Sequence, residues 1–165
     1  MSCMMTDDIQ TRMAEAVVQA SRSFHRLVLV VGASGTGKTR VLRQLAESQG
    51  CRYLNINLLL SQRLLEFPRS KRPRQVDRIF NELIDEKQNE MLILDNLEIL
   101  FDLSLQVDPL RLLLAASRKQ TLVAAWNGTM HDGALSYAEP DHPEYKSYRN
   151  VGVLVVSLST DQQCR

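Results

Sequence analysis

One octapeptide carries the residue types and spacing that could do chemistry in this chain. Residues 32–39 match the pattern G-x-x-x-x-G-K-[ST] in full, as Gly32, Ala33, Ser34, Gly35, Thr36, Gly37, Lys38 and Thr39. Glycines allow successive backbone N–H groups to turn inward around a phosphate. Lys38 would reach the β- and γ-phosphates of a nucleoside triphosphate, and the Thr39 hydroxyl would supply one magnesium ligand. The pattern therefore predicts a nucleotide and Mg²⁺ site, in which we include the next residue, Arg40.

The residues on either side of the octapeptide favour this interpretation over an ordinary glycine turn. The apolar run at 27–31 has the composition of a buried parallel strand. After Lys38, the residues Val41, Leu42 and Leu45 fall on one face of a helix, and Gly50 is a stop signal. A strand, a glycine-rich loop and a helix in this order form the context that a phosphate-binding loop requires.

A second candidate element ends at Asp95. The apolar run Met91 to Asp95 resembles a strand whose terminal carboxylate holds magnesium, although a buried strand with an acidic exit residue would look the same. Asn96 follows at the position where many ATPases have a glutamate that activates water. An amide can orient water but does not accept its proton as a carboxylate does. We therefore predict Asp95 as a metal ligand and Glu98 as a candidate general base, with a solvated charge as the alternative for Glu98.

Asn127 closes the next apolar run, at 121–126. If that run is a parallel strand, the Asn127 amide emerges at the ligand edge of the sheet and can contact water and the γ-phosphate. Its alternative role is a turn with Gly128, because Asn-Gly is a strong turn dipeptide.

Alternating strand-like and helix-like segments must position these residues. They predict an α/β, three-layer P-loop NTPase fold with a mostly parallel five-stranded sheet and ligands at the carboxyl ends of its strands. The whole chain, 1–165, is expected to be one domain with an N-terminal helix at about 6–22, capped by Thr6, and a core at about 27–158. The apolar face of that helix could pack in the core or line an adenine pocket. The expected strands are 27–31, 52–57, 91–95, 121–126 and 151–158. Between them, 58–67 is expected to be a helix or turn, and 76–84 is expected to be a helix that ends in a polar stretch at 85–90. Residues 128–150 are expected to form a loop, which Tyr137, Tyr145 and Tyr148 could anchor to the core or to a neighbouring subunit.

Composition narrows the class of protein further. With 44% hydrophobic residues, the chain can bury one core. Its formal net charge of +1 is too small to attract nucleic acid or a membrane surface through the overall charge of the protein. Three cysteines in no metal-ligand spacing, Cys3, Cys51 and Cys164, suit a reduced compartment. No signal peptide or spanning segment is evident, so we expect a cytoplasmic protein without membrane contact.

Positive charge is nevertheless concentrated around one proline-bounded segment. The cationic residues are Arg63, Arg69, Lys71, Arg72, Arg74 and Arg78. They could contact DNA phosphates, form a surface for an acidic partner, or simply be solvated.

The order of phosphate loop, Asp95 strand and Asn127 resembles that of the AAA+ and wider additional-strand ATPases, in which the last two elements are Walker B and sensor one. Segments 54–61, 94–102, 124–128 and 137–145 look like BrxF, the family of small P-loop proteins in bacterial BREX phage-defence systems. This resemblance implies binding of ATP and Mg²⁺ and a role beside other BREX defence proteins.

The chain also departs from the AAA+ pattern. Asn96 replaces the usual glutamate, and few residues follow the expected fifth strand, so we expect a fold lacking the helical lid domain. The expectation is an ATPase that is weak alone, or a nucleotide-dependent adaptor that does not hydrolyse. AAA+ rings complete each site with an arginine from a neighbouring subunit. The resemblance therefore implies a nucleotide-dependent homo-oligomer, with Arg149 or Arg118 as the contributed arginine.

Overall fold

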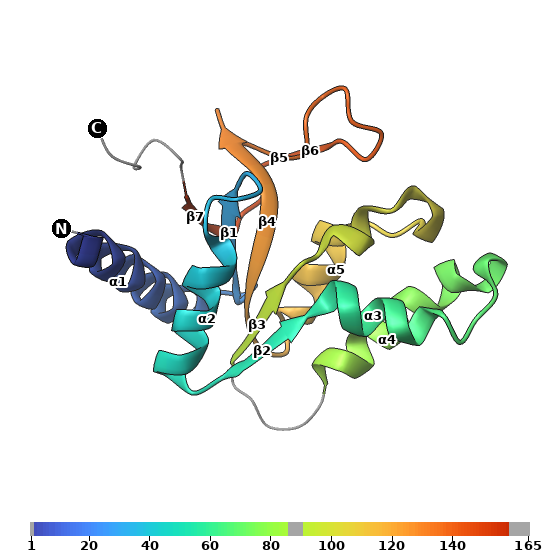
Figure 1. Cartoon of the computed structure of the whole chain (residues 1–165), viewed down its shortest axis with the longest axis horizontal. Helices are drawn as coiled ribbons and strands as arrows, with labels where there is room; N and C mark the ends of the chain where they lie inside the picture. Colours follow the sequence, from blue (N-terminus) through green and yellow to red (C-terminus); the bar gives the residue numbers. More distant parts are fainter. Residues whose placement is uncertain (1, 86–90, 159–165) are drawn as a thin grey trace.

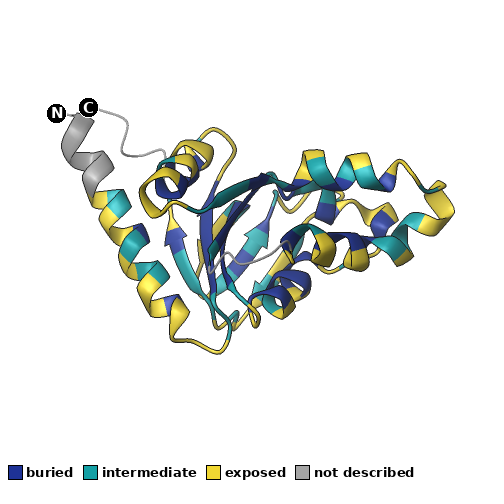
Figure 2. Cartoon of the chain, turned by 90° about the horizontal axis from the view of Figure 1, so that it is seen from below, coloured by how far each residue is buried: buried dark blue, intermediate teal, exposed yellow. Residues whose placement is uncertain are grey.

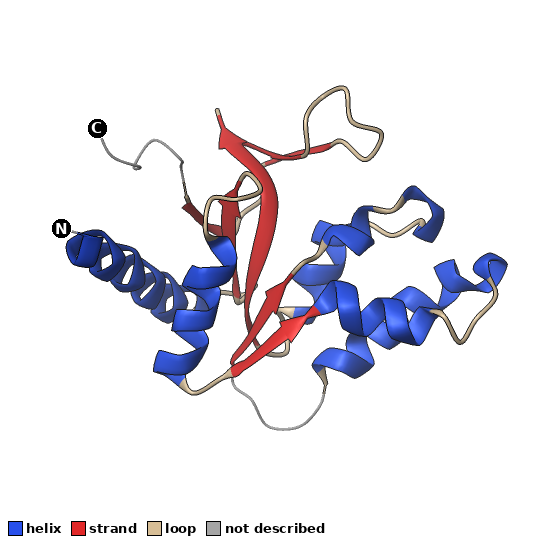
Figure 3. Cartoon of the chain, viewed as in Figure 1, coloured by secondary structure: helices blue, strands red, loops and turns tan. Residues whose placement is uncertain are grey.

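A sheet covered on both faces by helices organises the chain in the computed structural model, which describes residues 2–85 and 91–158, with side chains from residue 8 onward (Figures 1 and 3). The helices are α1 (Ser2–Ser21), α2 (Lys38–Gln49), α3 (Ile56–Leu64), α4 (Arg72–Ile84) and α5 (Pro109–Ala116), with three short turns of helix, η1 (Arg69–Lys71), η2 (Glu98–Phe101) and η3 (Leu103–Leu105). The strands are β1 (Leu27–Gly32), β2 (Arg52–Asn55), β3 (Met91–Asp95), β4 (Thr121–His131), β5 (Ala134–Tyr137), β6 (Lys146–Arg149) and β7 (Leu154–Ser157).

The parallel strands follow the order β2-β3-β4-β1-β7. Strand β4 therefore lies between β1, which leads into the octapeptide, and β3, which ends at Asp95. Its register sets Asn127 opposite Gly32, and β2 sets Asn55 opposite Asp95. All these residues lie at the same edge of the parallel sheet, where Gly32, Asn55 and Asp95 end their strands. The fold confirms the predicted P-loop NTPase architecture with five parallel strands and an additional strand inserted at β4.

Side-chain alternation along β1 divides the core into two layers. All six residues of β1 are buried, as expected for a central parallel strand (Figure 2). Leu27, Leu29 and Val31 face the layer formed with α3, α4 and α5. Val28 and Val30 face the layer formed with α1 and α2. The apolar face of α1 thus belongs to the core, and its Gln10 side chain donates to the α2 carbonyl of Val41 at 3.3 Å.

The largest difference from the sequence-based prediction is a hairpin built onto the sheet. Strand β4 does not stop at residue 126 but continues to His131, and its last four residues pair in antiparallel fashion with β5, which pairs with β6. Gly128 permits this pairing, because a Cβ there would lie 1.7 Å from the Ser136 carbonyl oxygen. The prediction of a loop over 128–150 was therefore wrong for these strands, and Asn127 and Gly128 do not form a turn.

Aromatic side chains hold the hairpin against the core. Phe101 of η2 stacks on Tyr137 with ring centres 3.4 Å apart, and Trp126 packs edge-on against Phe101 at 5.1 Å. Tyr148 packs against Trp126 and donates a hydrogen bond to Asp108 at 3.0 Å. The predicted anchoring role is confirmed for Tyr137 and Tyr148.

Several predicted boundaries move by a few residues. Helix α1 begins at Ser2 instead of residue 6, so Thr6 lies within the helix, and its side chain is outside the described part. Strand β2 ends at Asn55 because the Asn55 side chain caps α3 by accepting from the Leu58 N–H at 3.1 Å. Strand β7 is shorter than the predicted 151–158.

Part of the earlier predictions falls on residues that are not described. The polar stretch predicted at 85–90 lies outside the described residues beyond Asp85. Cys51 is a free thiol, and the side chains of Cys3 and Cys164 are outside the described part. None of the described helices has the length and apolar character needed to cross a bilayer.

Candidate nucleotide-binding site

The octapeptide forms the connection between β1 and α2. Gly35 and Gly37 have φ angles of 83° and 88°, in the left-handed region that glycine adopts without strain. Gly32 is needed for a different reason, because a Cβ there would lie 2.5 Å from the Thr36 hydroxyl oxygen. These glycines allow the backbone to turn tightly between β1 and α2. The loop therefore lies next to the N-terminus of α2, and helix N-termini bind anions favourably.

Lys38 lies folded over the loop. Its Nζ donates to the carbonyl oxygens of Gly32 and Ala33, both at 2.8 Å, and the residue is only 7% exposed. Burial lowers the pKa of Lys38 from its ordinary value, while the carboxylates of Asp95 and Glu98 act in the opposite direction. A phosphate at the loop would offer this amine a charged acceptor in place of the two neutral carbonyls. A hydrogen bond to a charged acceptor is stronger than one to a neutral carbonyl.

Thr39 and Asp95, the two predicted magnesium ligands, contact each other directly. Asp95 Oδ2 accepts from the Thr39 hydroxyl at 2.7 Å, and Oδ1 accepts from the Asn96 N–H at 2.9 Å. Asp95 is 3% exposed, so its carboxylate faces the site and not bulk solvent. A hydroxyl and a carboxylate are hard oxygen donors of the kind Mg²⁺ accepts, and this pair therefore fits the ion.

Tyr53 is a site residue that sequence reasoning missed. Its hydroxyl donates to Asp95 Oδ2 at 2.5 Å, and the Arg43 guanidinium lies 4.9 Å from the centre of its ring. Burial, then the hydrogen bond and the charge of Asp95, raise the pKa of Tyr53 to about 12. The only signal in the sequence was an aromatic residue in the expected strand 52–57.

Glu98 and Asn127 also meet at this edge of the sheet. The Asn127 side-chain amide donates to Glu98 Oε1. Glu98 is the first residue of η2, and Asn127 is the last β4 residue paired with β1. The structure thus brings the predicted base and the predicted sensor into direct contact.

Asn96 occupies a conformation that explains its residue type. Its φ angle is 54°, in the left-handed region, and its carbonyl accepts from the Asn57 N–H at 2.9 Å. Asparagine visits this region readily, whereas most other residues are disfavoured by about 1–2 kcal/mol. A glutamate in its place would therefore be strained in this backbone.

These residues surround one cavity of about 610 Å³, within the size range of small-molecule sites. Its lining combines the loop and α2 (Ser34, Gly35, Gly37, Lys38, Thr39, Arg40, Arg43, Gln44 and Glu47) with Asp95, Asn96, Glu98 and Asn127. The predicted residues Gly32, Ala33 and Thr36 lie in the loop but do not line the cavity. Arg43, Gln44 and Glu47 were missed, although they lie on the same face of α2: Arg43 is four residues after Thr39, Gln44 is four after Arg40, and Glu47 is four after Arg43.

Neither candidate arginine lies in the cavity of its own chain. Arg149 is exposed at the end of β6, opposite Ala134. Arg118 follows α5 and precedes β4, at the amino ends of the parallel strands, where its guanidinium lies 4.9 Å from the Phe24 ring centre. A role for either residue in this site would require a second copy of the chain.

The cationic side chains of the basic segment, residues 63–78, are of two kinds: some interact with other groups of the protein, and some are free. Arg63 and Arg78 each form an ion pair of 2.7 Å with Glu82, and Arg72 donates to two backbone carbonyls. The three other cations are exposed and have no partner among the described residues; they are Arg69, Lys71 and Arg74.

Comparison with known proteins gives one family match. The model of the viral superfamily 1 RNA helicase core domain matches residues 28–110, which include the phosphate loop and Asp95 but not Asn127. Among solved structures, the chain is similar to C. elegans PCH-2, with 19% identity and a TM-score of 0.44. That match covers 78% of this chain, which in turn spans 39% of the PCH-2 chain. No curated protein matches the chain.

Proposed function

Since the chain belongs to the family of viral superfamily 1 RNA helicase core domains, we propose that it binds ATP with Mg²⁺ and that its nucleotide state controls contact with further copies, partner proteins or nucleic acid. One observation carries this proposal, namely the convergence of Lys38, Thr39 and Asp95 in a single cavity. The loop N–H groups and Lys38 would hold the phosphates, and Thr39 and Asp95 would hold the ion. Mg²⁺, when bound, would neutralise part of the phosphate charge.

Replacing Lys38 tests this proposal. Lys38→Ala removes the one amine that can donate to the phosphates, and hydrogen bonds between charged groups contribute about 1.5–3 kcal/mol, so ATP affinity should fall about 10- to 150-fold. Lys119→Ala is the matched control, because Lys119 is exposed beyond α5 at the opposite edge of the sheet. Titration with a fluorescent ATP analogue measures both variants. Equal affinity in Lys38→Ala and wild type would refute the assignment.

We propose slow hydrolysis, with Glu98 as the group that accepts a proton from water. Asn127 binds a Glu98 carboxylate oxygen, and this contact must be rearranged before that oxygen can act as a base. A non-hydrolysing adaptor is the second candidate, favoured by the left-handed backbone at Asn96, which disfavours a glutamate there. Phosphate release from ATP, measured with and without DNA, separates slow hydrolysis from a non-hydrolysing adaptor. Variants at Lys38 and Asp95 give the background rate. Turnover no higher than this background under every condition favours the adaptor.

We further propose that Lys71 and Arg74 of the basic segment engage nucleic acid, and that the protein acts in phage defence. The exposed and unpaired side chains of Lys71 and Arg74 support the first point, because such groups bind phosphate backbone. The resemblance to the BrxF family supports the second. Salt-dependent binding of duplex DNA that is lost on Lys71→Glu/Arg74→Glu would support nucleic-acid contact. Loss of phage resistance in cells carrying Lys38→Ala would support the defence role.

A further inference from the structure

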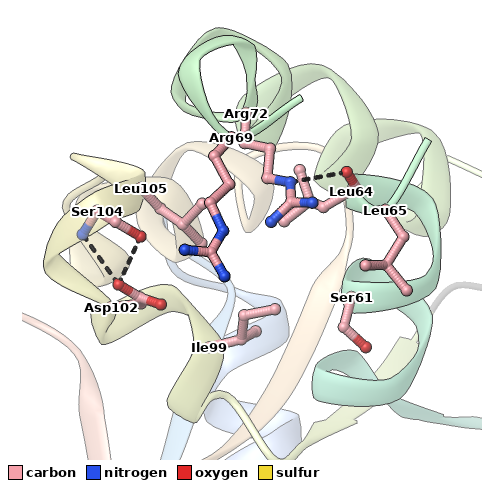
Figure 4. A pocket seen from close by; sticks show the side chains of 9 residues that line it. All are labelled: Ser61, Leu64, Leu65, Arg69, Arg72, Ile99, Asp102, Ser104 and Leu105. Atoms are coloured by element: carbon pink, nitrogen blue, oxygen red, sulfur yellow. Dashed lines mark hydrogen bonds between the residues drawn. The ribbon is translucent and has the colours of Figure 1, made fainter. Parts of the chain in front are cut away.

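A second cavity, of about 420 Å³, lies between α3, the η1–α4 junction and the η2–η3 segment (Figure 4). The η2 segment borders both cavities, because Glu98 lines the candidate nucleotide cavity and the next residue, Ile99, lines the second cavity. We call it the arginine cavity after Arg69 and Arg72, whose guanidinium groups both point into it in Figure 4.

The arginine cavity carries excess positive charge. Arg72 is fixed, because its Nε donates to the carbonyls of Leu64 and Phe67, both at 3.0 Å. Asp102 also lines the cavity but accepts instead from Ser104, from the N–H at 2.9 Å and the hydroxyl at 2.7 Å, and these bonds lower the pKa of its carboxyl. Neither arginine forms an ion pair within the described part of the chain. Two guanidinium groups are therefore available to an incoming anion.

The walls of the cavity indicate which anion it would take. Guanidinium groups bind carboxylate or phosphate through paired hydrogen bonds. Leu64, Leu65 and Ile99 add an apolar surface, and Leu65 is 72% exposed although it lines the cavity. No aromatic residue is among the described residues that line it, so a nucleic-acid base would find no aromatic ring to stack on. Carboxylates on a peptide with apolar residues beside them are the better match.

The chain itself carries such a peptide. The β5–β6 loop, residues 138–145, contains exposed Glu139 and Asp141, whose carboxylates have no partner among the described residues, and prolines at 140 and 143. Tyr145 at its end is 39% exposed. Backbone bonds from His142 to Glu139 at 2.9 Å and from Tyr145 to His142 at 3.0 Å shape the loop. Prolines and internal bonds reduce the entropy lost on docking.

We propose that the β5–β6 loop of one copy docks into the arginine cavity of a second copy, with Glu139 and Asp141 facing Arg69 and Arg72. Figure 1 shows the loop projecting at the top of the view, apart from the tip of α3 and α4 at the right. The two surfaces are different, so the contact is heterologous and builds a ring or an open filament.

Docking at this cavity would also act on the nucleotide site. Ile99 and Asp102 line the arginine cavity, and Glu98 belongs to the same short helix as Ile99. The hairpin that inserts its loop also carries Arg149, at the end of β6 that lies away from the loop and opposite Ala134. This consequence rests on the proposed function, whereas the docking contact does not.

Charge reversal on each side of the contact tests the proposal. Arg69 is exposed and unpaired, so Arg69→Glu should keep the fold while repelling the loop. Glu139→Lys/Asp141→Lys reverses the other side. Each variant alone should raise the dissociation constant for self-association at least tenfold, measured by sedimentation velocity. Lys119→Glu, which makes the same change of charge at an exposed position outside both cavities, should associate like wild type.

Mixing the two reversed proteins supplies the decisive measurement. An acidic cavity then meets a basic loop and a basic cavity meets an acidic loop, so association should return to the wild-type level. A wild type that stays monomeric at its highest soluble concentration overturns the proposal, as does association unchanged by the reversals or not restored by mixing. Monomeric protein whose oligonucleotide binding is lost on Arg69→Glu assigns the cavity to nucleic acid and also overturns it. ATP binding, titrated separately, reports on the proposed function alone.

Discussion

Tyr53→Phe is the substitution that best tests how Asp95 is held. It removes one hydroxyl, and with it the 2.5 Å hydrogen bond to Asp95 Oδ2. Hydrogen bonds to charged groups contribute about 1.5–3 kcal/mol, and we take the lower figure because Thr39 and the Asn96 N–H still donate to the carboxylate. For a chain of 165 residues, about 1.5 kcal/mol corresponds to a decrease in Tm of about 3–6 °C.

The same substitution should cost less when ATP and Mg²⁺ are present. A cation beside Asp95 compensates the carboxylate charge, so the lost hydroxyl matters less in the bound state than in the free state. If half of the cost disappears, about 0.7 kcal/mol of difference makes ATP·Mg²⁺ bind the variant about threefold more tightly than wild type.

Thermal unfolding followed by circular dichroism, with and without ATP and Mg²⁺, measures both effects. Tyr145→Phe is the matched control, because Tyr145 is exposed and its hydroxyl has no partner in the described part of the chain. A Tyr53→Phe shift no larger than that of the control would show that the hydroxyl does not stabilise Asp95. An equal shift with and without ligand would show that Asp95 does not face the ion.

Three further outcomes are expected. Glu98→Gln should lower kcat about 100-fold while ATP affinity stays within about threefold, because a general base acts on the chemical step; turnover equal to that of the exposed control Glu66→Gln would leave Asn96 or a partner as the catalytic group. Gly128→Ala should lower the free energy of unfolding by about 3 kcal/mol in a urea titration, because its Cβ would meet the Ser136 carbonyl oxygen at 1.7 Å; an unchanged midpoint would argue against the hairpin. Above pH 10 the fold should lose stability, because burial, with smaller effects from nearby carboxylates, raises the pKa of Tyr53 and of Tyr137 to about 12, so the folded chain holds these protons more tightly than the unfolded chain. This stabilisation is complete below pH 10 and is lost as the pH rises toward 12. Ultraviolet absorbance of the folded protein measures tyrosine ionisation. Ionisation of all tyrosines together near pH 10 would contradict the prediction.

Local patterns were sufficient to predict the phosphate loop and the sheet around it. The spacing of Gly32, Lys38 and Thr39 is a property of eight consecutive residues. The apolar runs before Asp95 and Asn127 are likewise local, and parallel pairing then brings their ends to one edge. The fold class and the neighbourhood of these residues could therefore be predicted without knowing any long-range contact.

The remaining features depend on contacts between distant residues. Tyr53 reaches Asp95 only because β2 pairs with β3, and nothing near Tyr53 in sequence signals that pairing. The hairpin escaped prediction because prolines and histidines gave residues 128–150 the composition of a loop, and because Asn-Gly is usually a turn. Here Gly128 instead allows the β5 backbone to approach closely. That role appears only once the Ser136 carbonyl is in place.

Strand β4 pairs in parallel with β1 and β3 and in antiparallel fashion with β5, and the change from one kind of pairing to the other falls at one peptide bond. Through Asn127 it pairs in parallel with β1, and from Gly128 onward it pairs only with the hairpin. The four residues beyond Asn127 make a lever arm of about 13 Å at about 3.3 Å per residue. A tilt of about 10° at Asn127 would then sweep the tip of β4 through about 2 Å, and the hairpin paired to it would move as well. A rotation at the nucleotide edge that is too small to break a hydrogen bond would thus become a displacement large enough for a second protein to detect.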